Sequence, residues 1–159
     1  MIKEYDRNSA LFYARRWAFD RNPDYYNFDA LGGDCTNFVS QCVYAGAGVM
    51  NYTPTVGWYY KNANDRTASW SGVDYFLDFL TDNGGIGPVA VATTRNGVNV
   101  GDVIFLGRVN GDFYHTLFIS RIENGNIYVA SHTRDALDRP ISDYSFNFIK
   151  FMHITGVRI

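Results

Sequence analysis

The sequence predicts an α+β fold in which helices come first and an antiparallel sheet follows. Helical apolar spacing is found in the first half of the chain, and short apolar runs typical of strands are found in the second half. The tetrapeptide at 123–126, Glu-Asn-Gly-Asn, is a strong hairpin signal within the second half. Segregated helix and strand patterns are typical of α+β folds. No repeat, low-complexity tract or linker interrupts the chain, so we expect one domain over residues 1–159.

Three helices are expected in order along the first half. The first is capped at Asn8 or Ser9 and runs to about Asp20. The second runs from about Cys35 to Ala45 and is stopped by the glycines at 46 and 48. The third begins in a capping-box pattern at residues 71–74, and its apolar residues recur at i, i+3, i+4 and i+7, namely Val73, Phe76, Leu77 and Leu80.

Four strands are expected in the second half. The hairpin signal joins the second of them to the third, because Asn-Gly readily adopts positive φ. The predicted strands are Asp102–Leu106, Phe113–Ile122, Asn126–His132 and Phe148–Val157.

Composition and charge exclude several classes of function. The net charge is −2, and no basic cluster is present, so neither nucleic acid nor an anionic membrane surface is an expected partner. No run approaches the ~20 apolar residues that span a bilayer, so no membrane insertion is expected. The N-terminal residues lack the apolar core of a signal peptide. Either the protein stays inside the cell or this chain is part of a longer secreted protein, and the sequence leaves both open.

The two cysteines, Cys35 and Cys42, lie in the second predicted helix. Their separation of seven residues corresponds to a rise of roughly 10 Å, whereas a disulfide requires Cα atoms about 4.4–6.8 Å apart. We therefore expect both thiols to be free. Two cysteines and three scattered histidines also make a poor structural zinc site, so no metal or other cofactor is predicted.

The two thiols have different expected roles. Cys42 lies on the apolar face of the helix and is expected to be core. Cys35 lies in the first helical turn, where unpaired N–H groups and the helix dipole favour a thiolate. This position suggests a nucleophile with a lowered pKa, although a second buried small residue remains an alternative.

The candidate base is His115, at the start of a strongly apolar strand. Taken alone, it is as consistent with a core histidine as with a catalyst. A two-residue hairpin loop would place His132 opposite Leu117, and therefore diagonal to His115 on the same sheet face. Together with Cys35, this is the arrangement of nucleophile, base and orienting residue.

Several motifs carry a resemblance to a known family. They are Tyr5-Asp6-Arg7-Asn8-Ser9-Ala10, Gly32-Gly33-Asp34-Cys35-Thr36-Asn37-Phe38-Val39-Ser40-Gln41, Gly57-Trp58-Tyr59-Tyr60, Gly101-Asp102-Val103-Ile104 and Tyr114-His115-Thr116. In this order, they resemble the bacterial putative amidase-domain family of papain-like cysteine hydrolases, related to NlpC-type peptidoglycan peptidases. The resemblance implies a papain-like fold whose nucleophile helix packs on an antiparallel sheet. It also implies Cys35 as the nucleophile, His115 as the base and His132 as the third catalytic residue.

Three further residues are candidates for substrate binding. Asp34 is expected to cap the helix that begins at Cys35, and in the related endopeptidases the aspartate before the cysteine contacts a substrate amine. The aromatic residues Tyr26 and Trp58 belong either to a groove for peptide or glycan or to the core. His153 is expected to be structural.

The predicted function is a metal-free cysteine amidase or peptidase that acts through a thioacyl-enzyme. Its expected partner is a peptide or peptidoglycan fragment, and cell-wall peptide is one candidate substrate. The alternative is a non-catalytic module that binds cell-wall peptide or glycan on the same fold.

Overall fold

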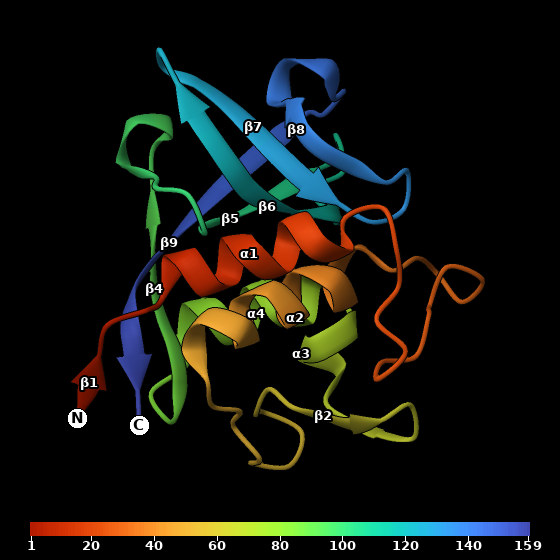
Figure 1. Cartoon of the computed structure of the whole chain (residues 1–159), viewed down its shortest axis with the longest axis vertical. Helices are drawn as coiled ribbons and strands as arrows, with labels where there is room; N and C mark the ends of the chain where they lie inside the picture. The colour runs from red at the N-terminus through yellow and green to blue at the C-terminus, as the bar shows by residue number, and fades with distance from the viewer.

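Four helices pack against a seven-stranded antiparallel sheet in the computed structural model, which describes residues 1–159 (Figure 1). The predicted α+β class is confirmed. The helices are α1 (Arg7–Trp17), α2 (Cys35–Ala47), α3 (Ala68–Ser71) and α4 (Val73–Asp82). None of them has the length and apolarity needed to cross a bilayer.

The helix ends differ from the sequence prediction in two places. α1 begins before the expected caps, because the carboxylate of Asp6 accepts the backbone N–H of Ser9. The capping box expected at residue 71 does not form: Ser71 ends α3, and Gly72 precedes α4 without a side-chain cap. α2 ends as expected at a glycine, since Gly48 has a left-handed φ of 74°.

The main sheet contains all four predicted strands and three others. The predicted strands are β5 (Val103–Gly107), β6 (Phe113–Glu123), β7 (Asn126–Ser131) and β9 (Phe148–Arg158). The additional strands are β1 (Ile2–Lys3), β4 (Gly87–Thr93) and β8 (Ala136–Pro140), and a separate small hairpin is formed by β2 (Tyr60–Asn62) and β3 (Asp65–Arg66).

Strand β9 pairs with three strands that are distant from it in the sequence. Along one edge it pairs with β4, and along the other it pairs first with β5 and then with β1. The sheet continues from β5 through β6 and β7 to β8. Both chain ends therefore lie together at one side of the molecule, as Figure 1 shows.

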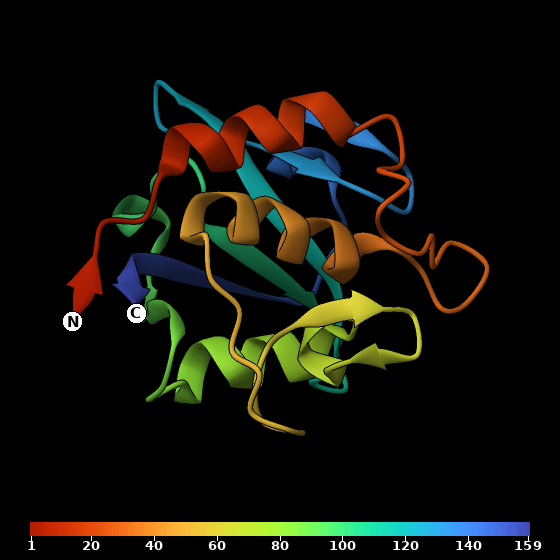
Figure 2. The ribbon, with the colours of Figure 1, turned by 60° about the horizontal axis from the view of Figure 1, so that its bottom comes forward.

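The helices cover one face of the sheet and create the larger core. Figure 2 shows α1, α2 and α4 side by side across this face. The core between the layers is aromatic, with Phe38, Trp58, Trp70 and Phe76 fully buried. Side chains of β5 and β6 alternate between this core and a second, aliphatic cluster on the opposite face. Because α2 packs on β6, the start of α2 is held beside the first residues of β6.

Candidate active site

Cys35 and His115 line one cavity of about 460 Å³. Cys35 comes from the first turn of α2, and His115 comes from the beginning of β6. The rest of the wall comes from the loop before α2, from β6 and β8, and from the segments that follow β5, β7 and β8. Its other lining residues are Gly32, Arg108, Tyr114, Thr133, Arg134, Arg139, Asp143, Tyr144 and Ser145.

The thiol of Cys35 faces the edge of β6. Pairing between β6 and β7 ends at Phe118 and Ala130, so the edge of β6 that faces β7 is open near Thr116. The Cys35 sulfur lies 3.8 Å from the Thr36 hydroxyl oxygen, which is 2.8 Å from that of Thr116. The helix start and the strand are thus joined by hydroxyl contacts at the sulfur.

Burial raises the pKa of the Cys35 thiol. Hydrogen bonds from Thr116 and Thr36, backbone and side chain, lower the pKa but do not outweigh the desolvation. The lowered pKa expected from the helix-start position is therefore wrong, because Cys35 is only 7% exposed. The resting state of the sulfur is a protonated thiol.

His115 is a neutral imidazole that opens into the cavity. Burial, and after it the positive charge of Arg139, lowers the pKa of His115 to about 4. The ring lies between the rings of Tyr114 and Tyr144, with centroid distances of 6.2 and 5.9 Å. The nitrogens of the His115 ring make no hydrogen bond to the protein. Because every fully buried polar side-chain atom in the protein has a hydrogen-bond partner, these nitrogens are not fully buried. The nitrogens are therefore accessible from the cavity, in the form that accepts a proton.

His132 does not occupy the position expected from the hairpin register. The predicted register holds near the hairpin loop, from the pair Glu123–Asn126 to the pair Arg121–Tyr128. A bulge then shifts the register by one residue, so that Ile119 pairs with Val129. Continued beyond β7, the shifted register places residue 132 opposite Thr116 rather than Leu117. A one-residue shift moves a side chain to the other face of the sheet.

Both ring nitrogens of His132 are bonded to other groups. Nδ1 lies 2.6 Å from a carboxylate oxygen of Asp34, and Nε2 donates to the Trp17 carbonyl oxygen at 2.8 Å. The ring also stacks on Phe38 at a centroid distance of 4.0 Å. The predicted hydrogen bond to His115 therefore does not form, and the contact of His132 with the site is through the residue before Cys35.

The carboxylate of Asp34 is buried and does not line the cavity. It accepts hydrogen bonds from the Phe28 N–H and the Asn37 side-chain amide, both at 2.9 Å, and contacts His132. α2 consequently has no side-chain cap, so the predicted capping role of Asp34 is wrong. The Asp34 N–H donates to the Thr133 hydroxyl at 3.0 Å, which ties the start of α2 to the turn after β7.

The two aromatic candidates lie outside the cavity lining. Trp58 is fully buried in the main core, where its indole N–H donates to Ser40 at 3.1 Å. Tyr26 is 43% exposed and packs on Phe28. His153, expected to be structural, bonds the buried carboxylate of Asp102 at 2.7 Å. No group of three or more His, Cys, Asp or Glu side chains is arranged to hold a metal ion.

Three arginines of the cavity were not identified from the sequence. Arg108 follows β5, Arg134 lies in the turn between β7 and β8, and Arg139 lies on β8. No sequence pattern groups them, because a complete hairpin separates Arg108 from the other two. They line one cavity because the segment after β5, the turn after β7 and strand β8 pack around the start of β6.

The chain matches the family model described as a putative amidase domain over residues 4–155. The protein belongs to this family. It is also similar to two Bacillus subtilis (strain 168) proteins, both described as uncharacterized. YjcM is 30% identical over 147 residues, which cover 87% of this chain and 33% of YjcM. YhbB is 34% identical over 130 residues, which cover 78% of this chain and 40% of YhbB.

Membership of the amidase-domain family confirms the family-level resemblance found in the sequence. The chain spans about a third of YjcM and two fifths of YhbB. No solved structure matches the chain.

Proposed function

We propose that residues 1–159 form one amidase domain that hydrolyses a peptide-like amide through a thioacyl-enzyme on Cys35. His115 is the proposed general base and acid. The observation that carries this proposal is that a thiol at a helix start and an accessible neutral imidazole line the same cavity. A nucleophile and a base that share a cavity are the minimum requirement for covalent amide hydrolysis.

In the proposed first step, the sulfur of Cys35 attacks the amide carbonyl carbon while its proton passes to a ring nitrogen of His115. A carbon–sulfur bond forms, and the carbonyl oxygen becomes an oxyanion. Because both groups are neutral at rest, the proton is transferred during attack rather than before it. The imidazolium then gives this proton to the amine nitrogen, the carbon–nitrogen bond breaks, and the amine leaves.

The first turn of α2 is the proposed site of oxyanion stabilisation. The helix has no side-chain cap, because the Asp34 carboxylate is bonded to the preceding loop and to His132. The Asp34 carboxylate therefore does not occupy the N–H groups of the first turn, and these groups and the helix dipole favour a developing negative charge there.

In the second step, His115 removes a proton from water, which attacks the thioester carbon. The carbon–sulfur bond breaks, the sulfur regains the proton from His115, and the carboxylic acid product is released. The cycle restores the thiol and the neutral imidazole and requires no metal ligand.

We propose cell-wall peptide as the substrate class, on the strength of the resemblance to peptidoglycan peptidases. His132 is proposed to contribute by holding Asp34 and hence the start of α2, rather than by contacting His115. The alternative of a non-catalytic binding module has less support, because Trp58, the largest aromatic side chain proposed for its groove, is buried.

Incubation with purified peptidoglycan and muropeptides, followed by mass spectrometry, tests the proposal. We expect products that carry one new amine and one new carboxylate, and we expect Cys35→Ala and His115→Ala to abolish them. Cys42→Ala is the matched control, since Cys42 is the other cysteine of α2 and lies in the core. Undiminished product from Cys35→Ala would refute the cysteine mechanism.

A further inference from the structure

The cavity around Cys35 and His115 contains an excess of positive charge. Arg108, Arg134 and Arg139 line it, and Asp143 is the one carboxylate among its lining residues. Cys35 and His115 contribute no charge at neutral pH, because the pKa of the thiol is raised and that of the imidazole is lowered. This concentration of positive charge occurs in a chain whose net charge is −2.

Arg108 and Arg134 have no carboxylate partner in the protein, and Arg139 has one long ion pair, with Asp143. None of their guanidinium groups makes a hydrogen bond to another protein group, and the nearest carboxylate contact is between Arg139 Nε and Asp143, at 3.8 Å. Elsewhere in the fold, Arg7, Arg15 and Arg21 each approach a carboxylate within 3.0 Å. The cavity arginines therefore retain free N–H donors.

Two of these guanidinium groups are held by aromatic rings. Arg108 lies over Tyr114 at 4.4 Å, and Arg139 lies over Tyr144 at 4.5 Å, measured from Cζ to the ring centroid. The same two tyrosines flank His115. A guanidinium that stacks on a ring keeps its in-plane N–H groups free, and this planar fork matches a carboxylate.

We propose that this cavity is a carboxylate-binding site and that the substrate is an amide with a free carboxylate close to the scissile bond. Arg139 and Arg108 are the specificity-determining residues, and Arg134 adds positive charge at the cavity. The inference rests on the proposed function, since it names the substrate class of the same site. Under this inference, an amide with no charged group near the scissile bond is not a substrate.

Binding of such a carboxylate would also act on the base. The positive charge of Arg139 is one cause of the low pKa of His115. A carboxylate paired with Arg139 offsets that charge, which raises the pKa of His115 toward its ordinary value. The base becomes stronger when the carboxylate substrate is in place.

A competition between two alkylating reagents tests the charge preference directly. Iodoacetate and iodoacetamide are similar in size, and both alkylate the Cys35 thiolate with release of iodide, but only iodoacetate is anionic. In an equimolar mixture, mass spectrometry of the Cys35 peptide gives the ratio of carboxymethyl to carbamidomethyl product. Both reactions need the same thiolate, so its pKa and accessibility cancel from the ratio.

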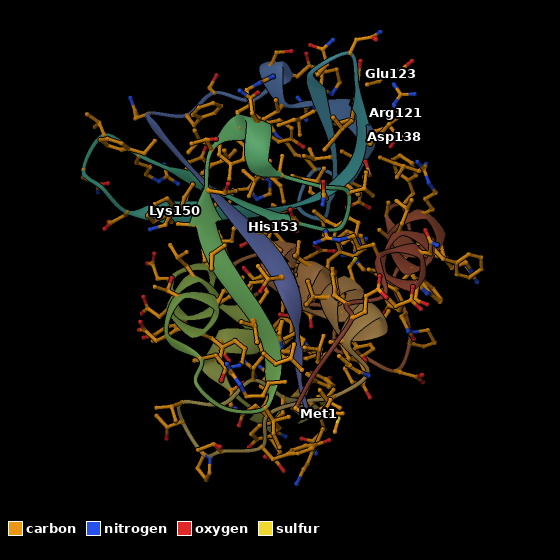
Figure 3. All side chains as sticks on the ribbon, turned by 90° about the vertical axis from the view of Figure 1, so that its left-hand side faces the viewer. Met1, Arg121, Glu123, Asp138, Lys150 and His153 are labelled. Atoms are coloured by element: carbon orange, nitrogen blue, oxygen red, sulfur yellow. The ribbon has the colours of Figure 1, made fainter.

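We expect this ratio to be roughly tenfold higher in the native protein than in the urea-unfolded protein, which corresponds to about 1.4 kcal/mol. Added NaCl should reduce it. Arg139→Gln and Arg108→Gln should each lower it about threefold. Arg121→Gln is the matched control, because Arg121 also stacks on a tyrosine, Tyr128, at 4.2 Å but does not line the cavity. Figure 3 shows Arg121 beside Glu123, with which it forms an ion pair.

Equal ratios in the native and unfolded proteins would overturn the inference, as would a native ratio that salt does not change. A second measurement tests the carboxylate itself: N-acetylalanine should protect Cys35 from iodoacetamide, and N-acetylalanine amide should not. Equal protection by the two would also overturn the inference. Neither measurement requires turnover, so an inactive protein that prefers the anion refutes only the proposed function, and an active one without the preference refutes only this inference.

Discussion

At the scale of single residues, burial determines the protonation state of the candidate catalytic pair. Cys35 and His115 are 7% and 9% exposed, and burial is the largest cause of both pKa shifts. Burial disfavours the charged form of each group, so the resting pair is a thiol and an imidazole rather than an ion pair. The pH dependence of Cys35 alkylation and the pH dependence of stability that arises from His115 can therefore be measured separately.

Alkylation of Cys35 should follow a raised thiol pKa. We expect the rate with iodoacetamide to increase about tenfold per pH unit from pH 6 to 8, because only the thiolate reacts. Cys42 should stay unlabelled in the native protein, since it is fully buried. Rates can be measured by mass spectrometry of the two cysteine peptides. A plateau below pH 7 would show a preformed thiolate and contradict this prediction.

The lowered pKa of His115 should make the protein sensitive to acid. The unfolded state binds a proton near pH 6.5, whereas the folded state binds one only near pH 4. Stability is therefore retained above pH 6.5 and lost as the pH falls toward 4. Between pH 7.5 and 4.5, urea denaturation should show wild type losing about 2 to 3 kcal/mol more than His115→Gln. An equal loss in the two proteins would place the pKa of His115 near its ordinary value.

At the scale of elements, the turn after β7 fixes the start of α2. His132 contacts the Asp34 carboxylate, and Thr133 accepts the Asp34 N–H. The Nε2 atom of His132 also donates to the last residue of α1, Trp17. Three elements thus meet next to Cys35, and the bulge between β6 and β7 is the feature that turns His132 toward them.

His132→Ala should therefore affect stability and catalysis together. Loss of its contact leaves the buried Asp34 carboxylate with fewer partners, which should cost about 1–3 kcal/mol. We expect reduced kcat with measurable turnover, whereas Cys35→Ala should have none. His132→Gln should retain more activity than His132→Ala, because its amide N–H can donate to Asp34. If His132→Ala left stability unchanged but abolished turnover, His132 would act in the chemistry rather than in positioning.

At the scale of the whole molecule, Asp102 connects elements that are far apart in the sequence. Its fully buried carboxylate accepts from Arg7 at the start of α1 at 2.8 Å. On β9 it contacts His153 at 2.7 Å and accepts the Ile154 N–H at 3.0 Å. Figure 3 shows His153 on β9 near the middle of the molecule. The first helix, the start of β5 and the last strand are thus held at one carboxylate.

Replacement of Asp102 by alanine should be strongly destabilising. It leaves the partly buried Arg7 guanidinium without its charge partner, and breaking such a pair typically costs 3–5 kcal/mol. Glu123→Ala is the control: its ion pair with Arg121, at 3.6 Å, is solvent-exposed and should contribute about 0–1 kcal/mol. Urea denaturation measures both. Similar losses of stability in the two variants would show that Asp102 does not hold the first helix, β5 and the last strand together.

Local patterns in the sequence predicted the elements that carry Cys35 and His115. α2 was predicted because the apolar face and the following glycines are features of the segment itself, and the same holds for β5, β6, β7 and β9. β4 and β8 were missed for different reasons. β4 contains Gly87, Pro88 and mostly small residues, and its pairing with β9 makes it a strand. β8 is short, partly polar and lies at the edge of the sheet.

The sequence by itself determined the α+β class, the family, the free thiols and the positions of Cys35 and His115 at the starts of a helix and a strand. Only the tertiary structure decided the partners of these groups. A bulge in the β6–β7 ladder directed His132 to Asp34, and burial raised the pKa of Cys35 instead of lowering it. The packing of distant segments around the start of β6 placed Arg108 and Arg139 in one cavity. Helix and strand periodicity are local properties, whereas register, desolvation and charge proximity depend on which distant segments pack together.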